Sequence, residues 1–141
     1  MAYDITLAND ANNVAEREYA KAAEVCFTQF TSCIGILARD GQVVTGIHLS
    51  VLSQDDTLFN VPAAGKAVAL IGNYQEVKVI GLADVWEDSF AAHKAQTGVI
   101  LTAYHYLLHL LKNPEIIQRD DGIYGARIRH GRLETFARVA V

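Results

Sequence analysis

The sequence predicts a single α/β domain of the α+β kind, built as a layered sandwich of largely antiparallel β-hairpins with packed helices. Two turn dipeptides, Asp40-Gly41 and His130-Gly131, each lie between alternating runs and therefore predict hairpins. Apolar residues between positions 61 and 112 recur at helical spacing, which predicts the helices. With 141 residues, 51% of them hydrophobic, and two prolines, the chain is long enough to form one core. Residues 1–141 are therefore expected to form one domain.

The N-terminal part is expected to contain a short strand and a helix. Residues 3–7 alternate weakly, as a strand does, and the polar run from Asn9 to Asn13 offers a turn and a helix N-cap. The Ala- and Glu-rich segment that follows predicts a helix ending near Val25. A hairpin from Cys33 to Val51 comes next.

The rest of the chain is expected to form helices, one strand and a closing hairpin. The expected elements are a helix over 62–71 with Pro62 in its first turn, a strand over 77–82, a helix from caps within 84–89 toward Gln96, a helix over 99–112 and a hairpin of 123–130 and 133–141. Asn113-Pro114 stops the last helix, and the residues around His130-Gly131 form the final turn.

Cys33 and His48 are the candidate catalytic pair, because the first turn sets their register. If Asp40-Gly41 forms a two-residue turn, Arg39 pairs with Gln42, and counting outward places Cys33 directly opposite His48. Directly opposed side chains have Cβ atoms about 4.5 to 5.5 Å apart. The count therefore predicts a Cys-His nucleophilic dyad.

Two glycines share the face of the predicted dyad. The same register opposes Gly35 and Gly46, which leave bare backbone beside the thiol. This gap could admit a substrate side chain, and it could equally mark a bulge or a tight helix contact.

Composition narrows the classes of partner and compartment. The net charge of -4 argues against a nucleic-acid binder, and no apolar run is long enough for membrane insertion. The N-terminus resembles no signal peptide, so a cytoplasmic protein with free thiols is expected. Cys26 has no partner in register and is expected to be a small buried hydrophobe, although Cys26 and Cys33 could pair in an oxidising compartment.

Several motifs resemble one enzyme family. The run TSCIGI from Thr31 to Ile36, followed by GIHL from Gly46 to Leu49, resembles the Ser-Cys and Gly-x-His signatures of the CheD family of chemoreceptor glutamine deamidases. The catalytic domain of the cytotoxic necrotizing factor toxins is similar in using Cys and His on a related fold. The segments KVIGLA (78–83), Thr97-Gly98, expected to open a helix, and 121–127 follow in the family's order. The resemblance spans roughly residues 25 to 140.

The resemblance implies a bacterial hydrolase and further site residues. The family places a threonine on an upstream strand near the catalytic His, for which Thr28 is the nearest match and Thr31 and Ser32 are competitors. The partner would be a protein substrate that bears a glutamine, either a chemoreceptor or another protein. A secreted effector is the alternative to a cytoplasmic enzyme.

The predicted dyad has a definite chemistry that requires no cofactor. As general base, His48 would raise the thiolate fraction of Cys33, whose ordinary pKa is about 8.5. The thiolate would attack a carboxamide carbon, with the oxyanion held by backbone N–H groups around Cys33, helped by Ser32 or Thr31. A thioester would form, and water would hydrolyse it to a glutamate side chain. Transglutamination, or cleavage of another amide or thioester, uses the same pair.

Other polar groups have simpler interpretations. His105 and His109 are spaced as a helical metal pair but lack the glutamate of an HExxH motif, and no CxxC spacing supports metal binding by Cys26, Cys33 and His48. No metal site is therefore predicted. Five arginines between positions 119 and 138 are expected on a solvated strand face.

Two hypotheses from other classes stand beside the enzyme. One is a non-catalytic binding module that keeps the fold, in which Cys33 and His48 only pack. The other is a self-associating structural protein, a homo-oligomer, that uses its Leu-rich helix.

Overall fold

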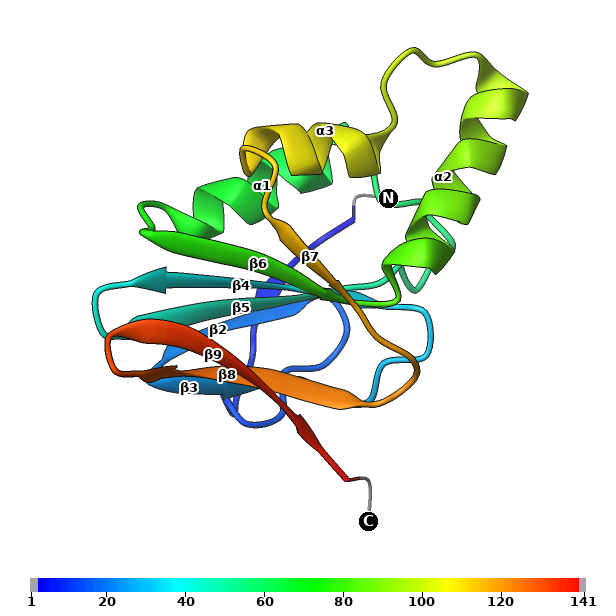
Figure 1. Ribbon diagram of the computed structural model, residues 1–141. Coiled ribbons are helices and arrows are strands. Elements are labelled where there is room, and N and C mark those ends of the chain that lie inside the picture. The colour runs from blue at the N-terminus through cyan, green and yellow to red at the C-terminus, as the bar shows by residue number, and fades with distance from the viewer. Residues whose placement is uncertain (1–2, 140–141) are drawn as a thin grey trace.

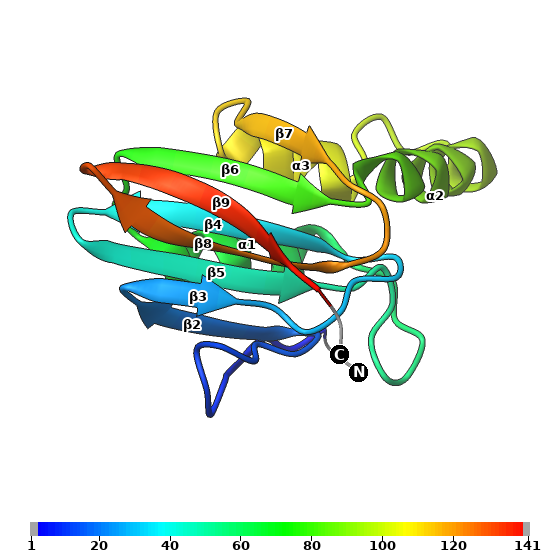
Figure 2. The same ribbon diagram turned by 60° about the horizontal axis from the view of Figure 1, so that its bottom comes forward.

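A computed structural model describes residues 3–139, which form three layers (Figure 1). Helices cover one face of a six-stranded sheet, and a three-stranded sheet covers the other face (Figure 2). The elements are β1 Thr6–Leu7, β2 Glu18–Ala22, β3 Glu24–Cys26, β4 Ile34–Asp40, β5 Val43–Leu49, α1 Val61–Ile71, β6 Glu76–Gly81, α2 Ala83–Thr97, α3 Ala103–Leu110, β7 Glu115–Gln118, β8 Ile123–Arg129 and β9 Arg132–Arg138. The α+β class predicted from the sequence is confirmed.

The strand order also confirms a largely antiparallel architecture. The large sheet runs β1-β2-β5-β4-β6-β7, and the small sheet runs β3-β8-β9. Among the strands named above for residues 3–139, the parallel pairs are the two edge pairs of the large sheet, β1 with β2 and β6 with β7. The hairpin β4–β5 therefore lies at the centre of the molecule, between the helices and the small sheet.

The turn of this hairpin differs from the predicted one by one residue. Asp40 pairs with Val43, so Gly41 and Gln42 form the turn, and His48 pairs with Gly35. The predicted pairing of Cys33 with His48 is therefore wrong. Gly41 has a φ of 61°, and a two-residue hairpin turn of the II′ type needs such a residue at its first central position. That requirement places Gly41, rather than Asp40, first in the turn.

The predicted faces of the hairpin nevertheless hold. The change in turn moves every pairing partner by two residues, whereas only an odd slip transfers side chains to the other face. Gly35 and His48 thus remain on one face, and Cys33, two residues before Gly35, has its side chain buried in the core on that same side.

The predicted N-terminal helix is wrong, because that segment forms β2 and β3. Ala20 pairs with Gly46 across β2 and β5, and Val25 pairs with Ala126 across β3 and β8. Both Ala20 and Val25 are buried. Alanine favours helices locally, but its small side chain also fits the narrow space between two closely packed sheets, and this tertiary packing overrides local propensity.

The other elements follow the sequence more closely. The helix α1 begins as predicted, with the side chain of Asn60 accepting a hydrogen bond from the Ala63 amide at 2.9 Å. The helix α3 begins at Ala103 rather than residue 99, because Thr102 is its N-cap. Gly98, with a φ of 73°, ends α2 rather than opening a helix.

The C-terminal half of the chain contains one strand that the sequence did not predict. β6, α2 and the closing hairpin confirm their predictions, except that the predicted end of the hairpin at 140–141 lies outside the described residues. The unpredicted strand is β7. Its four residues follow Pro114 and form an edge strand, too short to show a clear alternation; α3 itself ends at Leu110, before the predicted stop at Asn113-Pro114.

Two apolar clusters lie on opposite faces of the large sheet. The cluster under the helices is rich in aromatic rings, including Trp86 and Tyr104. The cluster between the two sheets contains Phe27, Phe30 and Cys33. No helix of the described residues is long and apolar enough to span a membrane.

Candidate functional site

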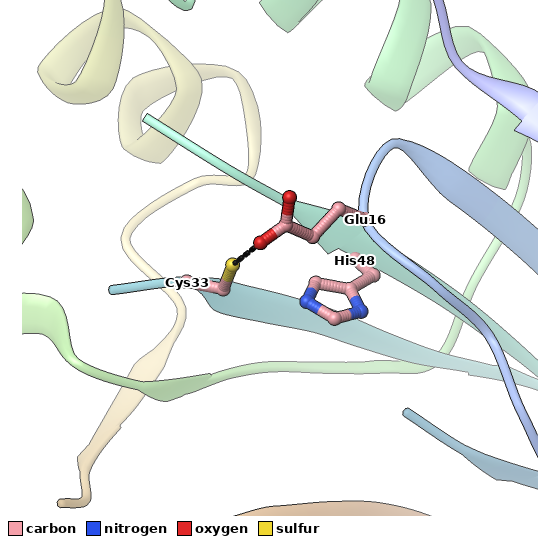
Figure 3. Close-up of side chains that lie close together, drawn as sticks. All are labelled: Glu16, Cys33 and His48. Carbon is pink, nitrogen blue, oxygen red and sulfur yellow. Dashed lines mark hydrogen bonds between the residues drawn. The ribbon is translucent and has the colours of Figure 1, made fainter. Parts of the chain in front are cut away.

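Three polar side chains meet at the end of the hairpin, on the side of the small sheet. A ring nitrogen of His48, the sulfur of Cys33 and a carboxylate oxygen of Glu16 all lie within 4.8 Å of one another (Figure 3). His48 is in β5, Cys33 directly precedes β4, and Glu16 lies in the segment before β2. The structure thus brings the predicted pair together, although diagonally rather than in direct register.

Glu16 is the member of this group that sequence reasoning missed. The Cys33 thiol donates a hydrogen bond to Oε1 of Glu16 at 3.4 Å. Arg17 donates to the other oxygen, Oε2, at 3.3 Å. Glu16 reaches the site only because β2 pairs with β5, where Glu18 opposes His48. No local signal indicates this placement, since the segment resembles a helix.

A backbone carbonyl fixes the ring of His48. Its Nδ1 lies 2.8 Å from the carbonyl oxygen of Val14, which also accepts a hydrogen bond from the Thr28 amide at 3.0 Å. A carbonyl only accepts, so Nδ1 carries the proton and Nε2 keeps a free lone pair. Nε2 is buried and has no hydrogen-bond partner among residues 3–139. The rings of Phe27 and Phe30 flank the imidazole, with centroids at 5.5 and 4.6 Å.

Burial keeps both members of the pair neutral at rest. Neither Cys33 nor His48 has exposed surface, each being 0% exposed. Desolvation, followed by the negative charge of Glu16, raises the pKa of the Cys33 thiol to about 12. Desolvation lowers the pKa of His48 below its usual 6.5, opposed by the hydrogen bond to Val14. The expectation that His48 raises the thiolate fraction of Cys33 is therefore not met in this resting arrangement.

The three hydroxyl residues named from the resemblance have different places around the site. A backbone hydrogen bond of Ser32 acts on the Cys33 sulfur in the direction that lowers its pKa. The Ser32 carbonyl accepts a hydrogen bond from Nε1 of Trp86 at 2.9 Å, which ties this loop to α2. Thr28 contributes its backbone amide beneath His48, and Thr31 is exposed.

The predicted role of Gly35 and Gly46 in substrate access is wrong. A Cβ atom on Gly35 would lie 2.4 Å from the ring of Phe27. A Cβ atom on Gly46 would lie 2.5 Å from a methyl carbon of Val25. The space above both glycines is thus filled by β3 and the residue after it. These glycines let the two sheets approach closely.

The other candidate groups have structural partners. Cys26 is a free, buried thiol in β3, and Cys33 is also free. The His105 ring forms hydrogen bonds with the Thr102 hydroxyl at 2.8 Å through Nδ1 and with the Glu87 carboxylate at 3.0 Å through Nε2. It therefore joins the N-cap of α3 to α2. Four of the five C-terminal arginines form ion pairs with glutamates of the sheets: Arg127, Arg129, Arg132 and Arg138.

The Leu-rich helix is not free for self-association along its apolar side. Leu107 and Leu111 are buried in the helix-side core, and Leu108 and Leu110 pack against it.

Comparison with known proteins adds no relative, since no protein family, curated protein or solved structure matches this chain.

Proposed function

We propose that the protein is a Cys-His amidohydrolase, and specifically a protein-glutamine deamidase that works through a thioester. One observation carries the proposal: the free Nε2 lone pair of His48 lies beside the Cys33 thiol, while Val14 holds Nδ1 in the required tautomer. A nucleophile, a base and a group that orients the base are the parts of an activated nucleophile.

His48, rather than Glu16, is the base in this mechanism. A carboxylate is a much weaker base than an imidazole and a poor acceptor for a thiol proton. Desolvation lowers the pKa of His48 overall, but the negative charge of Glu16 acts in the opposite direction and favours the imidazolium formed when the proton moves. Because the resting thiol is neutral, proton transfer accompanies attack on the substrate rather than preceding it.

The reaction proceeds in two halves. The Cys33 sulfur bonds to the carboxamide carbon of a glutamine side chain as its proton passes to Nε2 of His48. The Ser32 backbone amide, already close to the sulfur, would donate to the oxyanion. The imidazolium then protonates the nitrogen, the C–N bond breaks, and ammonia leaves a thioester behind.

Water completes the cycle. A water molecule gives a proton to His48 and adds to the thioester carbon, the C–S bond breaks, and the thiol regains its proton. The net change converts a carboxamide and water into a carboxylic acid and ammonia, which ionise to carboxylate and ammonium. No cofactor takes part in any of these steps.

Substrate would approach from the side of Glu16. The Glu16 side chain is 46% exposed, whereas Cys33 and His48 are fully covered. A glutamine side chain must therefore displace the carboxylate from the thiol. We place the enzyme in the bacterial cytoplasm or, as the alternative, among secreted effectors, acting on a chemoreceptor or on another protein.

Mass spectrometry of candidate substrates tests this function. The purified protein is incubated with the cytoplasmic fragment of a bacterial chemoreceptor, with a small GTPase and with unfolded casein, and peptides are searched for Gln-to-Glu conversion. We expect conversion by the wild type and by Cys26→Ser, and none by Cys33→Ser. Cys26 is the matched control because it is also free and buried but lies outside the site.

The contrary results are equally definite. Conversion that persists in Cys33→Ser means that another group is the nucleophile. Absence of conversion of all three proteins by the wild type rejects the deamidase and favours the non-catalytic module. That second candidate is supported by the complete burial of Cys33 and by the raised pKa of its thiol.

A further inference from the structure

The cluster of Glu16, Cys33 and His48 also has the composition of a metal site. It offers one oxygen, one sulfur and one imidazole nitrogen, and these atoms lie within 4.8 Å of one another. Thiolate, imidazole and carboxylate are the three ligand types that Zn²⁺ uses in proteins. The sequence alone predicted no metal here, because neither an HExxH motif nor CxxC spacing is present, and it gave no indication that Glu16 lies beside the other two.

The geometry and second shell fit a zinc ion. Zinc bonds of about 2.0 to 2.3 Å place ligand atoms about 3.5 Å apart. The Cys33 sulfur and Oε1 of Glu16 are already 3.4 Å apart, and no separation within the group exceeds 4.8 Å. His48 already donates its other ring N–H to the Val14 carbonyl, the usual second-shell partner of a metal-bound histidine.

An unpartnered atom points to a ligand at this place. Nε2 of His48 is fully buried and lacks a hydrogen-bond partner among the described residues. A buried acceptor without a partner is destabilising, and a bound cation removes that penalty.

We propose that Glu16, Cys33 and His48 bind one Zn²⁺ ion and leave a fourth coordination position open. Binding replaces the proton of the Cys33 thiol, which passes to the buffer, because a coordinating thiol is deprotonated. Nε2 of His48 also coordinates the ion through its lone pair. The consequence for activity rests on the proposed function: zinc removes both the nucleophile and the base, and so switches the hydrolase off.

Cobalt spectroscopy tests the site without any turnover. The full-length protein is stripped of metal with a chelator, which is then removed, and is titrated with Co²⁺, whose bond to a thiolate gives a near-ultraviolet charge-transfer band. We expect a band that saturates at one equivalent and is lost on addition of Zn²⁺. Cys33→Ser should abolish the band, and the matched variant Cys26→Ser should keep it.

A substitution at the buried Cys33 can disturb folding, so the affinity for Zn²⁺ is also measured in a variant at the exposed Glu16. Glu16 is exposed, so Glu16→Gln should fold normally and should weaken Zn²⁺ binding at least about 10-fold, measured by competition with a chelating dye. A wild type without the band, a band that survives in Cys33→Ser, or unchanged affinity in Glu16→Gln overturns the zinc site.

The outcomes for metal and for catalysis are separable. A cobalt band together with no deamidation of any substrate rejects the proposed function and leaves the metal site standing. Deamidation without a band, or deamidation that is insensitive to Zn²⁺, rejects the metal proposal alone.

Discussion

Each face of the large sheet covers one buried side-chain atom that has no hydrogen-bond partner among residues 3–139. On the face under the helices this atom is the hydroxyl oxygen of Tyr104, and on the face under the small sheet it is Nε2 of His48. The two atoms have different surroundings. The Tyr104 ring lies among aromatic rings, with Trp86 at 5.5 Å and Phe90 at 6.1 Å. His48 has a thiol and a carboxylate nearby.

The difference shows what turns a buried polar atom into a candidate site. Both environments are desolvated, and burial raises the pKa of Tyr104 to about 12, as it does for Cys33. Of these two environments, however, only the one between the two sheets brings together a proton donor, Cys33, an acceptor, Glu16, and an oriented ring, His48. The neighbours of a buried polar atom, rather than its burial, give it a chemical role.

Catalysis gives the largest expected contrast between the two faces. His48→Gln removes the proposed base but keeps a side chain of similar size, and should lower deamidation about 10²- to 10⁴-fold. Tyr104→Phe should leave the rate unchanged, because it alters only the helix side. Rates are measured from ammonia release. Equal losses in both variants would mean that the two faces are not distinct in function.

Packing between the sheets gives the next largest contrast. Gly35→Ala places a methyl group against Phe27 and should reduce the free energy of unfolding by about 1 to 3 kcal/mol. A Cβ atom on Gly65 in α1 would have no neighbouring atom within 4 Å, so Gly65→Ala should stabilise by about 0.5 to 1 kcal/mol. Urea denaturation measures both values. A stable Gly35→Ala protein would contradict the close contact between the sheets.

The pH dependence of stability probes the buried imidazole. The unfolded chain takes up a proton at His48 near pH 6.5, whereas the folded protein, in which the pKa of His48 is lowered, resists it. The free energy of unfolding should therefore fall as the pH drops below 6.5, by at most about 1.4 kcal/mol per pH unit from this group. The fall should be shallower in His48→Gln than in the wild type, as measured by urea denaturation.

Exposed His109 provides the control for this measurement. His109→Gln should keep the wild-type slope, because this side chain is exposed on α3 and lies outside the group of Glu16, Cys33 and His48. An unchanged slope in His48→Gln would show that the folded protein protonates His48 as easily as the unfolded chain does.

The smallest expected effect is a change in stability on removing the hydroxyl of Tyr104, which lies on the face of the sheet that the helices cover. Tyr104→Phe removes a buried hydroxyl that has no hydrogen-bond partner among the described residues and should stabilise the protein by up to about 1 kcal/mol in thermal denaturation. A clear destabilisation would indicate that the hydroxyl has a polar partner after all, and would weaken the contrast with His48.

The sequence by itself determined most of the regular elements of the fold. Alternation and a turn glycine define both hairpins, and helical spacing together with Asn60 defines α1. These signals are local: a strand or helix records its buried face in its own residues. For the same reason, the sequence could place Cys33 and His48 on one face, even though the pairing was wrong by one turn residue.

Only the tertiary structure decided the N-terminal strands and the third member of the site. Residues 18–26 have the composition of a helix, and they form strands because they pair with β5 and β8, elements that lie far from them in the chain. The positions of Glu16 and of the Val14 carbonyl depend on that long-range pairing. Such contacts join residues far apart in the chain, and no short stretch of sequence records them.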